Sequence, residues 1–205
     1  MLNLNRSIKF TPREQEVINA MMSKTSGGRL LTGSEIWEIN NKAEKALKHR
    51  ISKRTLWEQD CRCAYCECML VQGNCFIEHF VPKSLHREFV YEPENLTSSC
   101  GRCNCTGIKG NKETLNSTLN IEYSQNEFKI VHPYFDQPEQ HIVFKDPERT
   151  IFDKAKCSPK GLDTIEFFHW DDDDAIIARQ REVKTLGFPS TKRNYILKIS
   201  TYRKK

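Results

Sequence analysis

The chain has 205 residues, a formal net charge of +5 and a hydrophobic content of 38%. This composition allows one or two small domains with a real core, and it contains no apolar run long enough to cross a bilayer. No secretory signal precedes the first predicted helix, so we expect a cytoplasmic protein in a reducing compartment. The modest positive charge suits a nucleic-acid partner without identifying one.

Two helices are predicted in an N-terminal section, residues 1–58. Thr11 is a capping residue and Pro12 favours the first helical position, so the first helix should begin there. Ser34 should cap the second helix, which we expect to run to Trp57. One face of this second helix is basic, which usually means a solvated surface, but contact with a phosphate backbone is a second interpretation.

The central section, residues 59–120, contains two Cys-x-x-Cys motifs, Cys63/Cys66 and Cys100/Cys103. Each motif places two thiolates on one tight turn, and two such turns supply the ligands of a closed tetrahedral Zn²⁺ site. Eight of the nine cysteines lie between residues 61 and 105, which favours metal binding over disulfides. Three cysteines lie close enough to the motifs to replace one of these ligands, namely Cys61, Cys68 and Cys105.

Polar residues lie between the two cysteine motifs on what reads as a strand pair. Glu78 and His79 follow a short apolar strand, and Asn95 begins a second strand. After the second motif, a short helix is expected to begin near Asn104. Neighbouring strand residues point to opposite faces, so a site that uses both Glu78 and His79 requires a bulge or twist at the strand end, which we predict.

These motifs together resemble the HNH endonucleases, whose nuclease core is a ββα-metal finger. The matching stretches are CAYC at 63–66, IEHFVPKS at 77–84, NL at 95–96 and CGRCNCTGIKG at 100–110. The resemblance implies an α+β fold in which a zinc-stapled ββα-metal core is flanked by N-terminal helices and by a mixed strand and helix section at residues 121–205.

The resemblance also implies roles for individual residues. His79 would be the general base, and the amide of Asn95 would hold its ring or loop in place. Glu78 and Asn104 would bind one Mg²⁺ or Mn²⁺ ion, because their donors are oxygens. The cations that flank this site, and that we expect to contact neighbouring phosphates, are Lys83, Arg102 and Lys109.

The C-terminal section is predicted to contain short strands at 121–123, 128–131, 141–145 and 150–153, followed by helical segments from Leu162 and around Ile176. Its HPYFD, HIVF and SPKG stretches are similar to the C-terminal extension of HNH proteins in bacterial defence operons. In Septu and retron-type antiphage systems such a nuclease accompanies an ATPase, so this resemblance implies an ATPase partner. His132 is either a packing residue or a brace for the site.

The sequence therefore predicts a metal-dependent endonuclease that hydrolyses phosphodiester bonds. DNA is the favoured substrate, and RNA, including transfer RNA, stays open. The alternative is a zinc-finger module that binds nucleic acid, or an adaptor, without catalytic activity. The expected cofactors are a structural Zn²⁺ and a catalytic Mg²⁺ or Mn²⁺.

Overall fold

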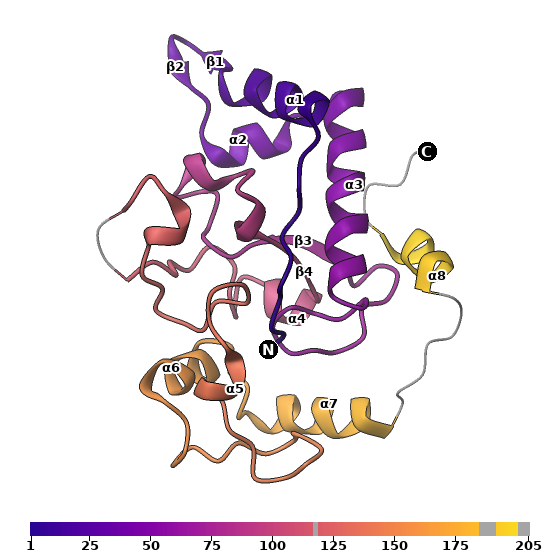
Figure 1. Cartoon of the computed structure of the whole chain (residues 1–205), viewed down its shortest axis with the longest axis vertical. Helices are drawn as coiled ribbons and strands as arrows, with labels where there is room; N and C mark the ends of the chain where they lie inside the picture. Colours follow the sequence, from indigo (N-terminus) through magenta and orange to yellow (C-terminus); the bar gives the residue numbers. More distant parts are fainter. Residues whose placement is uncertain (117–118, 185–191, 201–205) are drawn as a thin grey trace.

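A computed structural model gives the fold, and it describes residues 1–116, 119–184 and 192–200 (Figure 1). The helices are α1 (Pro12–Met22), α2 (Gly33–Glu38), α3 (Lys42–Glu58), α4 (Gly101–Asn104), α5 (Pro138–His141), α6 (Pro159–Phe167), α7 (Asp173–Lys184) and α8 (Lys192–Ile199). The strands are β1 (Thr25–Ser26), β2 (Arg29–Leu30), β3 (Phe76–His79) and β4 (Leu96–Ser99). The predicted α+β class is confirmed.

The start of α1 agrees with the prediction. The Thr11 hydroxyl accepts a hydrogen bond from the backbone N–H of Glu14 at 3.3 Å. The Glu14 carboxylate accepts one from the backbone N–H of Thr11 at 2.7 Å. This reciprocal pair is a capping box, and Pro12 occupies the first turn.

The single second helix predicted from Ser34 to Trp57 is wrong, because two helices occupy this stretch. Thr32, not Ser34, caps α2, and Asn41 caps α3 by accepting from the backbone N–H of Glu44 at 3.0 Å. The ammonium of Lys48 donates to the carbonyl oxygens of Trp37 and Ile39, so it satisfies the end of α2. Local capping therefore outweighs the continuous helical pattern.

Part of the basic face of α3 forms ion pairs with carboxylates of this chain. Lys48 is buried and lies 3.0 Å from the Glu44 carboxylate. Arg50 and Arg54 pair with Glu14 of α1 at 2.7 and 3.1 Å. These contacts hold α1 against α3, and contact between the rest of this face and phosphates stays a prediction.

The centre of the molecule is an antiparallel hairpin of β3 and β4, with α3 beside it and α4 following directly after β4 (Figure 1). Gln59, at the end of α3, clamps β4 through both backbone groups of Ser98. Its amide donates to the Ser98 carbonyl at 2.8 Å and accepts from the Ser98 N–H at 2.7 Å. The hairpin is thereby fixed to the N-terminal helices.

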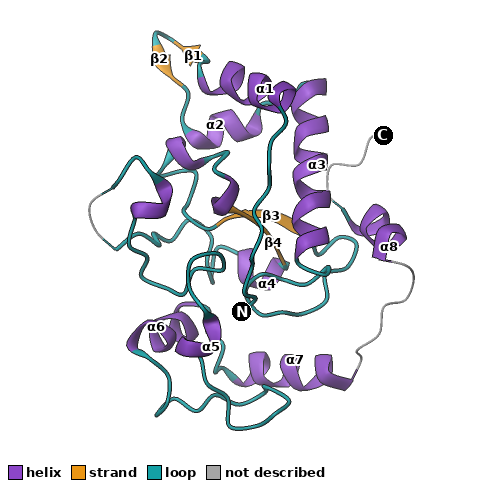
Figure 2. Cartoon of the chain, in the orientation of Figure 1, coloured by secondary structure: helices purple, strands orange, loops and turns teal. Residues whose placement is uncertain are grey.

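The four predicted strands after residue 120 are wrong. The described chain at these four positions is almost entirely loop, and its only strand-like pairing is in the isolated bridges Leu115–Phe128 and Phe144–Phe152 (Figure 2). Two of the residues that suggested strands, Tyr123 and Phe128, enter an aromatic cluster with His132 instead, whereas Ile121 is exposed. The predicted helical segments do occur, as α6 and α7.

One apolar core connects all three predicted sections. It extends from Met1 and Leu56 through the cysteine motifs to Ile165 and Ile199. A second core packs α1, α2 and α3 against the hairpin. Among the residues that the structure describes, no helix combines the length and apolar character needed to span a membrane.

Candidate functional site

Four cysteine side chains converge beneath the hairpin, as the spacing predicts. The Sγ atoms of Cys63, Cys66, Cys100 and Cys103 all lie within 4.8 Å of one another. Cys66 and Cys100 are 3.7 Å apart, and a tetrahedral site with Zn–S bonds of about 2.3 Å requires about 3.8 Å between sulfurs. None of the nine cysteines is in a disulfide, so no disulfide competes for these ligands. The cluster therefore fits a structural Zn²⁺ ion.

Backbone groups hold these sulfurs in place. The N–H of Cys100 donates to Cys63 Sγ at 3.4 Å, and the N–H of Cys103 donates to Cys100 Sγ at 3.5 Å. The neighbouring cysteine side chains, led by Cys103, lower the pKa of Cys100. Backbone N–H donors favour the thiolate form of a cysteine, and several thiolates this close together need a cation between them.

The remaining cysteines differ from this cluster in their surroundings. Burial raises the pKa of Cys61 to about 11 and that of Cys75 to about 12, which keeps both as thiols. Cys105 is exposed. The Cys68 side chain contacts Cys63, Cys66 and Cys100, but its sulfur is not among the four that all lie within 4.8 Å of one another. The ligand set favoured by the geometry is thus the predicted one.

A separate pocket of about 210 Å³ lies at the end of β3. Four of the predicted site residues line it, namely Glu78, His79, Lys83 and Asn104. The rest of the lining is Ile77, Pro82, Thr106, Gly110 and Asn111. The helix predicted to begin near Asn104 instead begins at Gly101 and ends at Asn104. Asn104 directly follows Cys103, so the cysteine motif positions it at the pocket. Of the lining residues, Thr106 and Asn111 were not singled out from the sequence.

His79 is the last residue of β3 and is 4% exposed. Its Nε2 atom lies 3.0 Å from the carbonyl oxygen of Val90. Because a carbonyl can only accept, Nε2 carries the proton, and in a neutral ring Nδ1 has a free lone pair. Burial, followed by the charge of Lys83, lowers the pKa of His79 and favours that neutral ring. The indole of Trp37 meets the imidazole edge-on, at 4.5 Å between ring centroids.

Glu78 is also 4% exposed, and it has a buried partner in Lys109. The ammonium of Lys109 lies 2.6 Å from Glu78 Oε1 and donates to the carbonyl oxygen of His79 at 2.8 Å. Burial raises the pKa of Glu78, and the Lys109 charge opposes this. Lys109 is only 1% exposed, so its placement differs from the surface position expected of a phosphate contact.

Of the bulge or twist predicted at the end of β3, the bulge is wrong. The ladder is one-to-one through Glu78–Thr97 and His79–Leu96, and the N–H of Phe80 still donates to the Asn95 carbonyl at 2.9 Å. Both side chains reach the same pocket because it lies at the end of the strand, where the residues that follow His79 complete its wall.

Asn95 is fully buried and binds the loop that follows His79. Its Oδ1 accepts from the N–H of Val81 at 2.6 Å, and its Nδ2 donates to the carbonyl oxygens of Val81 and Phe89 at 3.1 and 2.8 Å. Phe89 immediately precedes Val90, the partner of His79. The amide therefore lies where it can set the position of the imidazole through this loop.

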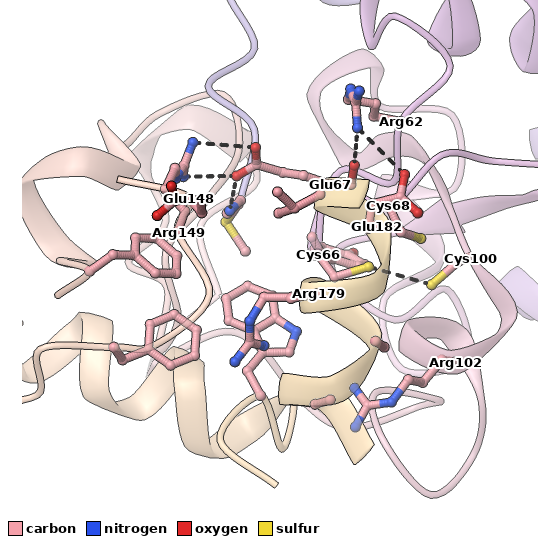
Figure 3. A pocket seen from close by; sticks show the side chains of 18 of the residues that line it. Arg62, Cys66, Glu67, Cys68, Cys100, Arg102, Glu148, Arg149, Arg179 and Glu182 are labelled. Atoms are coloured by element: carbon pink, nitrogen blue, oxygen red, sulfur yellow. Dashed lines mark hydrogen bonds and ion pairs between the residues drawn. The ribbon is translucent and has the colours of Figure 1, made fainter. Parts of the chain in front are cut away.

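Arg102 lies apart from the pocket at His79. Its guanidinium donates to the carbonyl oxygen of His169 at 3.2 Å and lies 3.4 Å from the Asp174 carboxylate of α7. It lines a different pocket, of about 440 Å³, with Cys66 and Cys100 on one wall (Figure 3). Lys83, in contrast, lines the pocket that contains His79.

The fold and site define an α+β protein with a four-cysteine cluster that could hold a metal ion, and with a separate polar pocket. Part of the chain is similar to the Septu protein PtuB of Bacillus thuringiensis, with 36% identity over 83 residues. The match covers 40% of this chain and 27% of that protein, so the chain spans only about a quarter of the length of this curated relative. No family model and no solved structure matches the chain.

Proposed function

We propose that this protein is a metal-dependent endonuclease of the HNH type, which hydrolyses phosphodiester bonds in nucleic acid, with DNA as the favoured substrate. The observation that carries the proposal is the pocket at the end of β3. There an imidazole anchored through Nε2 lies beside a carboxylate and an amide, on a scaffold that a cysteine cluster stabilises. The order of β3, β4 and α4 along the chain supports the proposal, because a ββα-metal finger would consist of two strands followed by a helix.

Glu78 and Asn104 would hold a single divalent cation through their oxygens. Carboxylate and amide oxygens suit Mg²⁺ or Mn²⁺, and the absence of sulfur and imidazole from this pair makes zinc a poor fit. When bound, the cation would polarise the scissile phosphate and stabilise charge on the leaving oxygen. Asn104 follows Cys103 in α4, so the backbone of the second cysteine motif places Asn104 at the pocket.

His79 would act as the general base. Nδ1 would take a proton from the attacking water, while the Nε2–H stays bonded to the Val90 carbonyl. That carbonyl would stabilise the imidazolium formed when the proton arrives. Lys83 would contact a phosphate of the substrate, as its place in the lining suggests.

The biological role that we propose is that of the nuclease in an antiphage defence system, acting together with an ATPase subunit. The similarity to the Septu protein PtuB supports this role, as does the HPYFD stretch at residues 132–136. RNA, including transfer RNA, stays a second substrate class, because base-plus-metal hydrolysis does not depend on the sugar.

A second candidate is a zinc-stabilised module that binds nucleic acid or serves as an adaptor without cleaving. The specific observation in its favour is that Lys109 already occupies one oxygen of the Glu78 carboxylate. A catalytic cation would have to share or displace that contact.

The two candidates differ in metal-dependent cleavage. We expect the purified zinc-loaded protein to cut supercoiled plasmid, single-stranded DNA or transfer RNA in the presence of Mg²⁺ or Mn²⁺. Asn104→Ala should raise the Mg²⁺ concentration needed for half-maximal rate, because one ligand oxygen is lost. The matched control is Asn116→Ala, on an exposed residue outside the pocket. Binding without cleavage under every metal condition would instead support the second candidate.

A further inference from the structure

A buried row of polar groups continues from Asn95 into the C-terminal section. The Tyr123 hydroxyl lies 2.9 Å from Asn95 Oδ1 and 3.0 Å from Nε2 of His132. The backbone N–H of Tyr134 in turn donates to Nδ1 of His132 at 3.1 Å. None of the three side chains is at the surface: Asn95 and His132 are 0% exposed and Tyr123 is 3% exposed.

The donor and the acceptor of each hydrogen bond in this row can be assigned, and every bond donates from His132 toward Asn95. Nδ1 of His132 accepts from a backbone N–H, so a neutral ring carries its proton on Nε2 and donates it to the Tyr123 oxygen. The Tyr123 hydroxyl then has its own proton for Asn95 Oδ1. Burial lowers the pKa of His132 and raises that of Tyr123, so both groups stay neutral and this order is maintained.

The fixed direction determines the orientation of the Asn95 amide. With Oδ1 accepting from Tyr123 and from the N–H of Val81, Nδ2 must face the carbonyl oxygens of Val81 and Phe89. A flipped amide would set an N–H₂ group against two donors. The row therefore orders the backbone that ends at Val90, the anchor of His79 Nε2.

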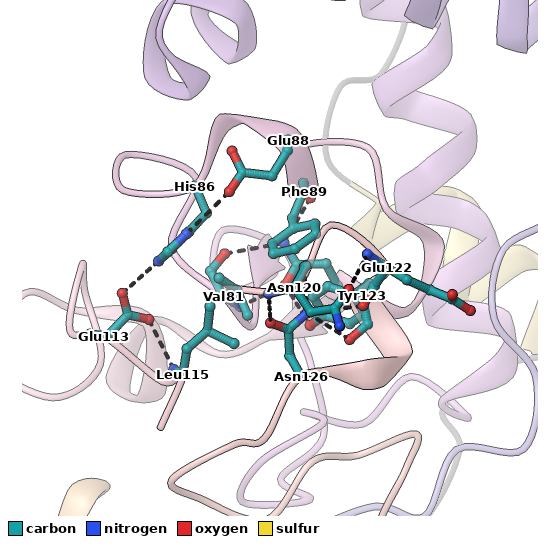
Figure 4. A network of polar contacts seen from close by, with 11 residues as sticks. Val81, His86, Glu88, Phe89, Glu113, Leu115, Asn120, Glu122, Tyr123 and Asn126 are labelled. Carbon is teal, nitrogen blue, oxygen red and sulfur yellow. Dashed lines mark hydrogen bonds and ion pairs between the residues drawn. The ribbon is translucent and has the colours of Figure 1, made fainter. Parts of the chain in front are cut away.

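The segment that carries Tyr123 is held in shape by its own hydrogen bonds, and the Tyr123 ring contacts Phe89 of the same loop at 4.9 Å between ring centroids. The side-chain amide of Asn126 donates to the carbonyl oxygens of Asn120, Glu122 and Tyr123, at 2.9 to 3.1 Å (Figure 4). On the loop side, Nε2 of His86 lies 2.6 Å from the Glu113 carboxylate. Figure 4 shows the Asn126 contacts within the segment of residues 120–126, and the His86–Glu113 contact between the chain around residues 81–89 and the chain around residue 113.

We infer that Tyr123 and His132 are positioning residues for His79, and that they act through Asn95 and the loop of residues 80–90. This inference rests on the proposed function for its catalytic consequence, but not for the geometry. A packing role for His132 accounts for its contacts with Phe80 and Phe135, at 4.2 and 4.5 Å between centroids. It does not account for a ring that accepts a hydrogen bond at Nδ1 and donates one from Nε2 toward Tyr123.

The test compares Tyr123→Phe with Tyr195→Phe. Tyr195 is a matched control, because its buried hydroxyl also donates one hydrogen bond, to the carbonyl oxygen of Leu70 at 2.7 Å, but outside this row. We expect Tyr123→Phe to lower kcat about tenfold with KM and zinc content unchanged, as for one lost buried hydrogen bond. It should also shift or broaden the NMR signal of the His79 Nε2–H. Tyr195→Phe should change neither.

A second pair of variants protects the test against a folding defect in Tyr123→Phe. His132→Gln retains an N–H donor directed at Tyr123, whereas His132→Leu has none, so His132→Gln should stay closer to wild type in the His79 signal and in kcat. An unchanged His79 signal in Tyr123→Phe and in His132→Leu would overturn the inference. If the signal changes as expected and the wild-type protein cleaves nothing, the positioning of His79 stands and the proposed function falls.

Discussion

Replacing Asn95 by alanine removes a side chain that makes four hydrogen bonds in a fully buried place. The change leaves the N–H of Val81, the carbonyl oxygens of Val81 and Phe89, and the Tyr123 hydroxyl short of a partner. A buried polar group without its partner costs about 1–3 kcal/mol. The loop can shift so that water solvates some of these groups, and the full sum of four penalties is then not reached. We therefore expect the free energy of unfolding to fall by about 4 kcal/mol in total.

Urea titration with zinc present measures this loss directly. A fall of about 4 kcal/mol is a large part of the stability of about 5–15 kcal/mol typical of folded domains, so the midpoint should move strongly while the slope stays constant. Asn116→Ala, at an exposed position, should stay within about 0.5 kcal/mol of wild type. A loss below about 1 kcal/mol for Asn95→Ala would refute the reasoning, because the four hydrogen bonds would then contribute almost nothing to the free energy of unfolding.

Three further predictions concern the buried charges and the cysteines. Glu78→Gln and Lys109→Met should each destabilise the protein by about 3–5 kcal/mol, because each leaves a buried partner alone, and combining them should recover much of the loss. Cys100→Ser should lower the zinc content and unfold the chain around the cluster, whereas Cys105→Ser, on an exposed thiol, should not. Burial raises the pKa of Glu14, but its hydrogen bonds and the nearby arginine charge outweigh burial and lower it, so Glu14 stabilises the fold above its ordinary pKa of 4.5 and loses this contribution below it. Glu14→Gln should therefore differ from wild type at pH 7 and converge with it on acidification.

Each of these expectations has an outcome that contradicts it. Additive losses in the Glu78→Gln/Lys109→Met double variant, measured by urea unfolding, would show that the two groups are not coupled. Full zinc content in Cys100→Ser, measured with a colorimetric chelator, would remove that cysteine from the ligand set. A stability difference for Glu14→Gln that stays constant from pH 7 to pH 3 would show that its ionised form contributes nothing.

The features predicted correctly from the sequence are those determined over a few residues. Thr11, Pro12 and Glu14 form a cap within one turn, and the spacing within each Cys-x-x-Cys motif fixes two sulfurs on one turn. The start of α2 also has a local signal, since Thr32 and Glu35 have capping-box spacing, and the break between α2 and α3 is marked by Asn41, which caps α3.

The features that were missed depend on contacts between distant residues. Phe128 and its neighbours have strand-like composition, but whether they pair with a strand or enter an aromatic cluster is decided by what lies opposite them. The side-chain direction of Lys109 likewise depends on the turn of the chain after the second cysteine motif, which returns it to Glu78. The polar row through Tyr123 joins residues 28 positions apart in the sequence, and no local pattern indicates it.

The central claim is that the imidazole of His79 removes a proton from water in a metal-dependent cleavage reaction. The most direct measurement is the cleavage rate of His79→Ala in Mg²⁺ beside that of His169→Ala, which changes a largely exposed histidine. We predict a fall of at least about a hundredfold for His79→Ala, with zinc content and nucleic-acid binding retained, and no change for His169→Ala. Equal cleavage rates in His79→Ala and the wild-type protein would contradict the account.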